Sequence, residues 1–352
     1  MNAKQRLRQF TKLIIATSLQ YTGLLSYMRS RIMRDKAAVL MYHRIIPQEE
    51  AKYDYAPNGM VVTTSLFEKH IQYLAKHYHT VTINELCDIL DKKEFTSKKP
   101  LLAVTFDDGW LDNYTNALPI LNKYNVPATI FIGCNFIDNN EWYWLERVKF
   151  VLAHAHKSLI EKHIDGEQRQ QLQDLLSELN LESIFQKFMP DLGLYLNDVV
   201  KRVNKMDVSD KKLFLTNIEN IAELSNLTNK QYFMDWQQVK SLSDKGIEIG
   251  AHTITHTDLT SLSVDLAEKE ITESKSILES KLGYKINNFA FPYGKNNKNI
   301  QDYIKKTGYR SACSTISGLV DDGANHYHLK RINMHTDVSF TSSMFGIRIL
   351  AL

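Results

Sequence analysis

Short apolar runs that have the pattern of buried strands alternate with segments in which apolar residues recur at helical spacing. This alternation occupies two stretches of the chain, residues 38–132 and 247–314. The strand-like runs are short and apolar, and helix-like segments such as residues 264–282 separate them. Regular alternation of this kind is typical of βαβ units, which place parallel strands side by side under a cover of helices. We therefore predict an α/β fold with a mainly parallel sheet or barrel, whose strands are residues 38–46, 79–83, 101–106, 126–132, 247–251, 288–292 and 311–314.

The alternation is interrupted in the middle of the chain. Residues 138–230 contain no convincing strand, whereas leucines recur there at helical spacing. A stretch of this length is too long for a structureless loop in a compact domain. We predict a helical insertion at about 138–230, inside a barrel domain that covers residues 36–345. Trp142 and Trp144 open the insertion, and we expect them either to line the substrate or to anchor a core.

Residues 1–35 combine basic side chains with apolar ones and predict a basic amphipathic helix. The apolar run is shorter than the ~20 residues that a membrane-spanning helix needs. Three alternatives remain open: a helix on an anionic membrane surface, a helix packed on the outside of the domain, or a cleaved signal peptide. The first two predict a protein that is cytoplasmic or peripheral on the inner membrane, and the third predicts export.

The overall charge excludes one class of partner. The chain of 352 residues carries 43 basic and 40 acidic residues, for a net charge of +3. This near balance gives no reason to expect a nucleic-acid partner. The three cysteines, Cys87, Cys134 and Cys313, are far apart and form no CxxC pair, so they predict neither a disulfide framework nor a cysteine zinc site.

Two acidic residues, Asp107 and Asp108, stand side by side at the end of the apolar run 101–106, directly before Gly109. Neighbouring residues on an extended chain point to opposite sides, so one carboxylate is able to bind a metal while the other faces a water molecule. The competing interpretation is an ordinary turn that ends a strand and begins a helix.

His252 and His256 follow the strand-like run 247–251, four residues apart. This spacing places two imidazoles on one face of a helical turn, as in other zinc sites. Both the aspartates and the histidines lie at carboxyl ends of predicted strands, where parallel α/β barrels place their active sites. One carboxylate and two imidazoles with a second carboxylate nearby are the side chains of a hydrolytic zinc site.

Three segments, in this order, resemble the motifs of NodB-type polysaccharide deacetylases, which form carbohydrate esterase family 4. The resemblance covers most of residues 36–335 apart from the insertion. A further run, Leu40-Met41-Tyr42-His43-Arg44, resembles the Tyr-His strand of the branch that modifies exopolysaccharides and lipid-linked sugars. The three motif segments are Thr105-Phe106-Asp107-Asp108-Gly109, His252-Thr253-Ile254-Thr255-His256 and Phe289-Ala290-Phe291-Pro292-Tyr293-Gly294.

The resemblance implies a distorted (β/α)7 barrel, the NodB homology fold, with a divalent metal that is usually zinc. By position, Asp108, His252 and His256 would be the metal ligands, and Asp107 would be the general base. The backbone N–H of Tyr293 would stabilise the oxyanion, with Pro292 beside it in the substrate site.

The chain departs from the family pattern at two places. Many members carry an arginine in the third motif that orients the base, where this chain has Ala290 and Phe291. Arg331 is our candidate to replace that arginine. The Leu-x-His motif that supplies the general acid is also absent, which leaves His43, His328 and His335 as candidates, with His43 preferred because it lies toward the carboxyl end of the first strand.

We predict a metal-dependent hydrolase that removes N-acetyl groups from an amino sugar. The substrate would be a surface polysaccharide or its lipid-linked precursor, and residues 1–35 would favour contact with a membrane. Two alternatives remain. One is a deformylase or another amide hydrolase on a lipid-linked sugar, and the other is a catalytically silent carbohydrate-binding barrel.

Overall fold

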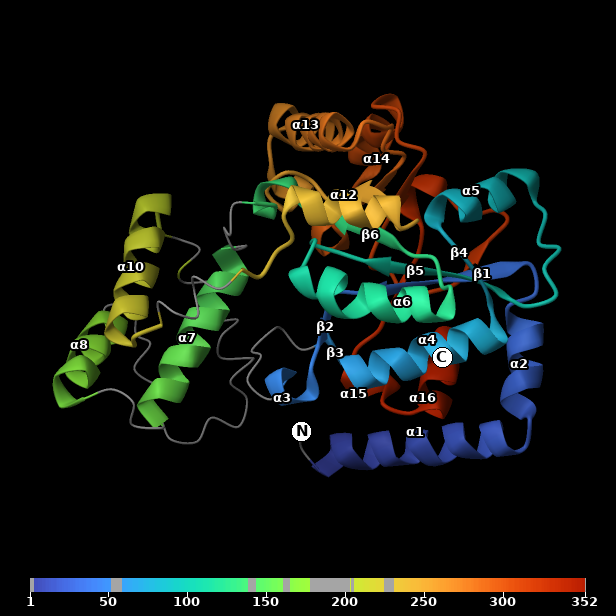
Figure 1. Cartoon of the computed structure of the whole chain (residues 1–352), viewed down its shortest axis with the longest axis horizontal. Helices are drawn as coiled ribbons and strands as arrows, with labels where there is room; N and C mark the ends of the chain where they lie inside the picture. Colours follow the sequence, from blue (N-terminus) through green and yellow to red (C-terminus); the bar gives the residue numbers. More distant parts are fainter. Residues whose placement is uncertain are drawn as a thin grey trace. The chain divides into compact units, whose positions relative to one another are not determined.

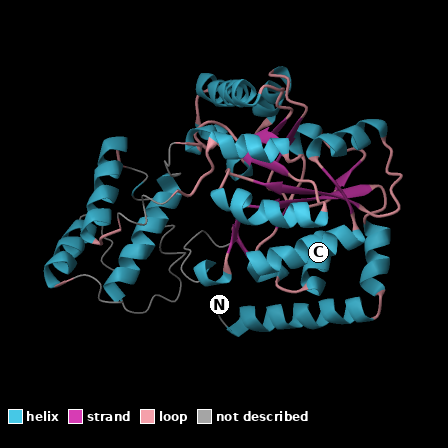
Figure 2. Cartoon of the chain, viewed as in Figure 1, coloured by secondary structure: helices cyan, strands magenta, loops and turns pink. Residues whose placement is uncertain are grey.

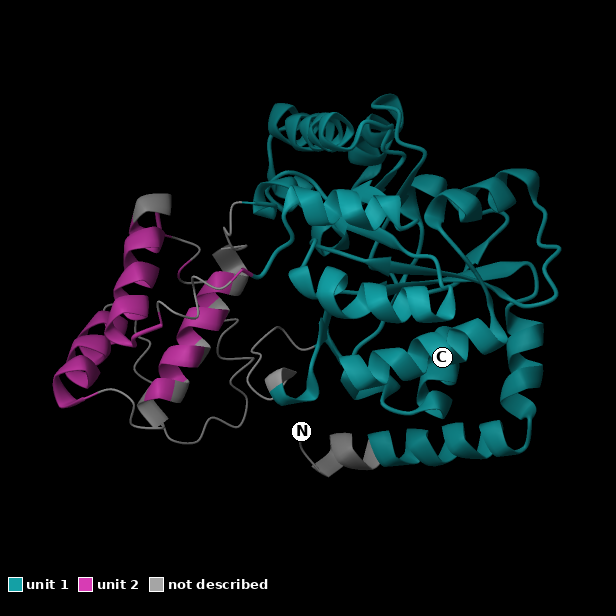
Figure 3. Cartoon of the chain, in the orientation of Figure 1, with its two compact units in different colours: residues 1–51, 59–139, 232–352 teal, residues 52–58, 140–231 magenta. Residues whose placement is uncertain are grey.

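The computed structural model describes residues 3–51, 59–138, 144–160, 165–177, 203, 206–224 and 231–351. The chain divides into two compact units, coloured separately in Figure 3. Unit 1 comprises Met1–Ala51, Gly59–Asn139 and Tyr232–Leu352, and unit 2 comprises Lys52–Asn58 and Asn140–Gln231. Unit 2 thus contains most of the stretch that the sequence assigns to an insertion.

Unit 1 is built around a curled sheet, with helices outside it (Figures 1 and 2). Its strands are β1 Lys36–Tyr42, β2 Arg44–Ile46, β3 Val61–Thr63, β4 His79–Val81, β5 Leu101–Phe106, β6 Thr129–Ile132, β7 Glu248–Ala251, β8 Asn288–Ala290, β9 Ser311–Cys313, β10 Val320–Asp321 and β11 Ile332–Asn333. Its α-helices are α1 Ala3–Tyr21, α2 Leu24–Ile32, α3 Gln48–Ala51, α4 Thr64–His77, α5 Ile83–Lys92, α6 Leu118–Tyr124, α12 Trp236–Asp244, α13 Val264–Leu282, α14 Lys298–Lys306, α15 Thr336–Ser339 and α16 Ser342–Ile349.

Nine strands of the described residues form one sheet in the order β10-β1-β5-β6-β7-β8-β9, with β4 paired to β5 and β11 paired to β1. The neighbours are parallel except for β10, which runs antiparallel to β1. Leu329 bridges to Cys313 of β9, while Ile332 pairs with Leu40 of β1. Residues 329–333 therefore connect the two far edges of the sheet and close it into a distorted barrel.

The local sequence explains the elements that position the site. All six residues of β5 are buried, as expected for a parallel strand covered on both faces. Helix α13 begins after Ser263 and ends at Gly283, whose φ of 81° is the left-handed conformation that ends helices. It buries a stripe of side chains at spacings of three and four, Ala267, Ile271, Ser274 and Leu278.

Several boundaries differ from the sequence prediction, and most of the strands are shorter than predicted. The predicted strand 38–46 is two strands, β1 and β2, which belong to different sheets and meet at His43. The predicted single helix in residues 1–35 is also wrong, because Gly23 adopts a left-handed φ of 74° between α1 and α2. At the other end, α16 runs beyond residue 345, where we expected the barrel to end.

Unit 2 has a hydrophobic core of its own. Its described helices are α7 Trp144–Ile160, α8 Gly166–Ser177 and α10 Val208–Ile221. Val151, Leu176 and Ile218 represent the three helices in this core. The guanidinium of Arg147 donates two hydrogen bonds of 2.9 Å to the Glu219 carboxylate and ties α7 to α10.

Among the described helices of the chain, none is both long enough and apolar enough to cross a lipid bilayer.

Candidate metal centre and active site

The backbone turns sharply where β5 ends, and this turn separates the two aspartates. Asp107 N donates to Tyr42 O at 3.1 Å and continues the ladder between β5 and β1. Asp108 and Gly109 then adopt positive φ angles of 81° and 84°. A Cβ on Gly109 would come within 3.2 Å of Ile137, so both the backbone angle and the space favour glycine.

His252 and His256 lie on a loop rather than on the helical turn that their spacing predicts. His252 follows β7, and its N–H donates to Ile132 O at 2.9 Å. Thr253 and His256 have φ angles of 64° and 55°, which no right-handed helical turn contains. The N–H of His256 donates to Thr253 Oγ1 at 2.9 Å, so the threonine stabilises the loop.

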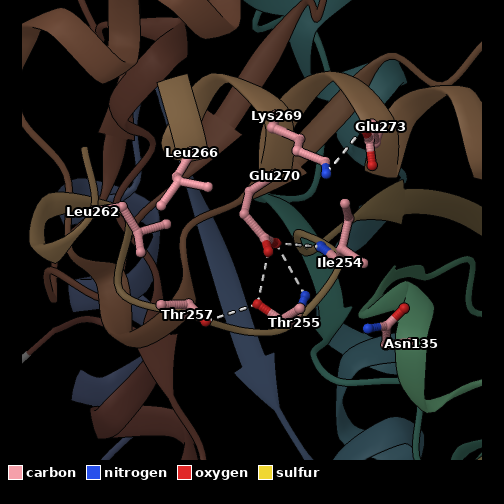
Figure 4. A pocket seen from close by; sticks show the side chains of 9 residues that line it. All are labelled: Asn135, Ile254, Thr255, Thr257, Leu262, Leu266, Lys269, Glu270 and Glu273. Carbon is pink, nitrogen blue, oxygen red and sulfur yellow. Dashed lines mark hydrogen bonds and ion pairs between the residues drawn. The ribbon is translucent and has the colours of Figure 1, made fainter. Parts of the chain in front are cut away.

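Glu270 of α13 holds this loop from the outside (Figure 4). One of its carboxylate oxygens accepts hydrogen bonds from Ile254 N at 2.8 Å and Thr255 N at 3.0 Å. The other oxygen accepts from Thr255 Oγ1 at 2.7 Å. These bonds explain why the loop is not helical, since its backbone donors turn outward to Glu270. The carboxylate also lines an open pocket of about 360 Å³, with Leu262 and Lys269.

The loop and the β5 turn bring the three predicted metal ligands together. His252 Nε2 and His256 Nε2 each lie 3.5 Å from Asp108 Oδ1. The side chains are nearly buried, with exposed fractions of 2% for His252, 9% for His256 and 4% for Asp108. Zinc with tetrahedral bonds of about 2.0–2.1 Å separates its ligand atoms by about 3.3 Å. All three ligand atoms lie within 4.8 Å of one another, so two imidazoles and one carboxylate suit a site with three protein ligands.

Neighbouring groups orient these ligands. His252 Nδ1 lies 2.7 Å from Ala290 O, so it donates its hydrogen there and leaves Nε2 as the metal-binding atom. The indole N–H of Trp110 donates to Asp108 Oδ2 at 2.9 Å. Trp110 stacks on Phe233 and lies under the guanidinium of Arg44. Trp110 was not among the predicted site residues. Its position two residues after Asp108 is the only feature of the sequence that indicates a role beside this ligand.

Arg331 contacts the second carboxylate. Its two terminal nitrogens donate to Asp107 Oδ1 and Oδ2, both at 2.7 Å, and the Arg331 side chain is fully buried. Burial tends to raise the pKa of Asp107, but the Arg331 charge and hydrogen bonds, together with the nearby histidines, lower it overall. Asp107 is therefore ionised at neutral pH. The structure thus places Arg331 where we expected a substitute for the family arginine.

His43 faces the same carboxylate from the gap between β1 and β2. His43 Nε2 lies 4.0 Å from Asp107 Oδ2. Its backbone carbonyl accepts a hydrogen bond from Asn113 Nδ2 at 2.7 Å, which anchors this turn. Of the other two candidate acids, His335 instead has its Nδ1 3.4 Å from Asp337 Oδ2. His328 ends a short 3₁₀ turn, His326–His328, and burial beside Lys330 lowers its pKa.

Burial lowers the pKa of His256 to about 3, more than the nearby aspartates raise it, so this imidazole is neutral and able to bind a metal. The Tyr293 ring packs edge-on against His256, with centroids 4.7 Å apart. Tyr293 has a φ of 56° and follows the buried Pro292 at the end of β8. Tyr293 of the third motif thus lies beside a predicted metal ligand. Trp142 and the side chain of Trp144 lie outside the described residues.

Comparison with known proteins gives consistent matches. A family model described as polysaccharide deacetylase matches residues 94–207 and 210–312, more than half of the chain. YxkH of Bacillus subtilis (strain 168), which carries the name of a polysaccharide deacetylase, is 24% identical over 315 residues, covering 89% of this chain and 76% of its own length. The poly-beta-1,6-N-acetyl-D-glucosamine N-deacetylase of Staphylococcus epidermidis is 22% identical over 240 residues, covering 62% of this chain and 72% of its own length.

A solved structure shares the fold. The Streptococcus pyogenes deacetylase PplD, solved in complex with acetate, matches with a TM-score of 0.55 and 20% sequence identity, covering 86% of this chain and 94% of its own. Together with the sheet topology, this likeness confirms the predicted distorted (β/α)7 barrel.

Proposed function

Because the chain belongs to the polysaccharide deacetylase family, it is a hydrolase of carbon–nitrogen amide bonds, and we propose that it removes acetyl groups from N-acetylated amino sugars with the help of a divalent metal. The observation that carries the proposal is the position of the buried Asp107–Arg331 pair next to Asp108, His252 and His256. A carboxylate base beside three metal ligands is an arrangement able to hydrolyse an unactivated amide.

Asp108, His252 and His256 would hold the metal, and zinc suits this set of nitrogen and oxygen donors. When bound, a divalent metal polarises the acetyl carbonyl and lowers the pKa of a water molecule. The protein supplies the rest of the chemistry. Buried ligands keep the site dry, and the hydrogen bonds from Trp110 and to Ala290 fix the directions of Asp108 and His252.

Asp107 acts as the general base. It accepts a proton from water while the water oxygen forms a bond to the acetyl carbon. Arg331 keeps the carboxylate ionised and holds both of its oxygens, so that the base does not rotate away from the water. A positioned base of this kind contributes a factor of about 10²–10⁴ to the rate.

His43 donates the proton that the leaving amine needs. The bond between the acetyl carbon and the sugar nitrogen then breaks, and the products are acetate and a free amino sugar. The 4.0 Å separation of His43 Nε2 and Asp107 Oδ2 supports this role, because acid and base must both reach the same amide. The backbone N–H of Tyr293 stabilises the negative oxygen that forms during the attack.

The relatives suggest the class of sugar. One of them carries a name that specifies poly-beta-1,6-N-acetyl-D-glucosamine. We therefore propose an N-acetylhexosamine glycan, or its lipid-linked precursor, as the substrate. The acetyl group of this substrate would lie beside Asp108, His252 and His256, within reach of Asp107 and His43, while the sugar stays outside.

The test measures acetate and formate released from β-1,6-linked N-acetylglucosamine oligomers and from lipid-linked N-acetylhexosamine or N-formylhexosamine. Protein loaded with zinc is compared with protein stripped by a chelator. We expect zinc-dependent release of acetate. Release of formate alone would instead identify a deformylase. No release of either acid, with one zinc bound per chain, would contradict an N-acetylated sugar as substrate. The exposed Asp302→Asn variant serves as the control and keeps full activity.

A further inference from the structure

Helices α1 and α2 are part of unit 1 and pack on it by one face. Ala16 is fully buried, and Leu25 and Met33 are nearly so. Thr17 Oγ1 lies 3.5 Å from Ser343 Oγ of α16, and Gln9 donates to the carbonyl of Asp337. Figure 1 shows α1 along the outside of the unit, beside α15 and α16. The N-terminal segment is thus attached to the domain, as one of the sequence alternatives predicts.

Several large apolar side chains of these helices are exposed to solvent, interspersed with small polar residues such as Thr11 and Ser18. Of thirteen large hydrophobic side chains that are exposed in the described residues, six lie within residues 10–27. Their exposed fractions range from 44% to 88%. Isolated exposed apolar side chains are common on protein surfaces, but six of them within 18 residues form a cluster. A cluster of this kind marks an interaction surface. We name it the N-terminal apolar face, and its members are Phe10, Ile14, Ile15, Tyr21, Leu24 and Tyr27.

Charge is strongly segregated to the same segment. Residues 1–34 contain seven of the 43 lysines and arginines and none of the 40 acidic residues. The other 318 residues therefore carry 36 basic side chains against 40 acidic ones. The net charge of +3 is therefore the sum of +7 in residues 1–34 and −4 in residues 35–352. In the described part of this segment, Lys12, Arg31 and Arg34 are exposed.

We propose that the N-terminal apolar face docks on the surface of an anionic lipid bilayer. Apolar side chains flanked by cations match an interface in which acyl chains lie beneath anionic headgroups. A second copy of the chain fits less well, because pairing two such faces would bring together two segments of +7. The helices lie flat on the surface, since no described helix is able to span a bilayer. This inference does not depend on the proposed deacetylation.

The experiment measures sedimentation of the full-length protein with vesicles of phosphatidylcholine, with or without phosphatidylglycerol. We expect binding to the anionic vesicles that weakens at high salt. The triple variant Lys12→Gln, Arg31→Gln, Arg34→Gln should reduce partitioning by about a hundredfold, because each basic residue near the surface contributes about fivefold. Its matched control replaces three exposed lysines of α13 and α14, Lys269, Lys298 and Lys306, with glutamine and should bind normally.

A second pair of variants tests the apolar contribution. Phe10→Glu combined with Ile14→Glu should abolish sedimentation, whereas Val264→Glu, at an exposed apolar position of α13, should not. Acetate release and thermal unfolding confirm that each variant is folded. Equal binding to both kinds of vesicle, or no binding to either, would overturn the proposal. A dimer in light scattering that Phe10→Glu with Ile14→Glu dissociates would assign the face to a second copy instead.

Discussion

Arg331 holds both carboxylate oxygens of Asp107 at 2.7 Å, although 224 residues separate the two in the sequence. Both side chains are buried, and Arg331 also donates to Ser314 O and Thr105 Oγ1. The segment that closes the barrel between β9 and β1 carries this arginine, so the same segment completes the sheet and forms the Asp107–Arg331 ion pair.

Replacing Arg331 with methionine should therefore affect both stability and catalysis. Removing one member of a buried ion pair leaves an unpaired charge and costs about 3–5 kcal/mol in the free energy of unfolding. The pKa of Asp107 should rise once the guanidinium is gone, so the acid limb of kcat/KM should move to higher pH. Urea unfolding and a pH–rate profile measure the two effects. Lys298→Met, which removes an exposed ion pair, should cost about 0.5 kcal/mol or less.

The sign of the pH effect on this pair follows from the lowered pKa of Asp107. The pair contributes its full stability above the ordinary carboxyl pKa of about 4 and loses it as the pH falls further. Arg331→Met should lack this acid-dependent loss. An unchanged free energy of unfolding in Arg331→Met would contradict the importance of the pair.

The burial of His70 should make the free energy of unfolding depend on pH between about pH 4 and 6.5, above the range in which Asp107 titrates. His70 stacks on Phe345, its Nε2 lies 2.8 Å from Ser339 O, and burial lowers its pKa to about 4. The unfolded chain binds a proton near pH 6.5, so stability is greatest above that pH and falls toward pH 4 by about 3 kcal/mol. Denaturant unfolding across this range should show a flatter profile for His70→Gln. The same change at the exposed His79 should leave the wild-type slope.

Glu270 should control metal affinity without touching the metal. Glu270→Ala frees the backbone of Ile254 and Thr255 between the two histidine ligands. We expect zinc affinity to fall by about 10–100-fold, as for other groups that support metal ligands, while kcat at saturating zinc stays near the wild-type value. Competition with a chromogenic chelator measures the affinity. Glu273→Ala, one turn further along α13, is the control, and equal affinities for the two variants would refute this role.

The sequence predicted those parts of the structure that local patterns determine. The strand 101–106 and the helix 264–282 have the predicted bounds, because a continuous apolar run and a capped amphipathic helix are strong signals. The short strands β10 and β11, of two residues each, were not predicted, since pairing with β1 rather than residue pattern defines them. The break at His43 was missed because apolar residues continue on both sides of it.

The site was predictable in composition but not in shape. The order of the motifs identified Asp108, His252 and His256, and the structure brings them together. Their spacing predicted a helical turn, whereas the backbone N–H groups of Ile254 and Thr255 donate to Glu270, more than ten residues downstream, and favour a loop. Trp110 was overlooked because one indole hydrogen bond leaves no pattern in a single sequence.

Asp107 is the proposed base, and Asp108, His252 and His256 are the proposed metal ligands. The most direct test measures zinc content and kcat for acetate release in Asp107→Asn and His252→Ala. Asp107→Asn should bind one zinc per chain while kcat falls by about 10²–10⁴-fold, and His252→Ala should lose both zinc and activity. Wild-type activity in Asp107→Asn, or stoichiometric zinc with full activity in His252→Ala, would contradict the account.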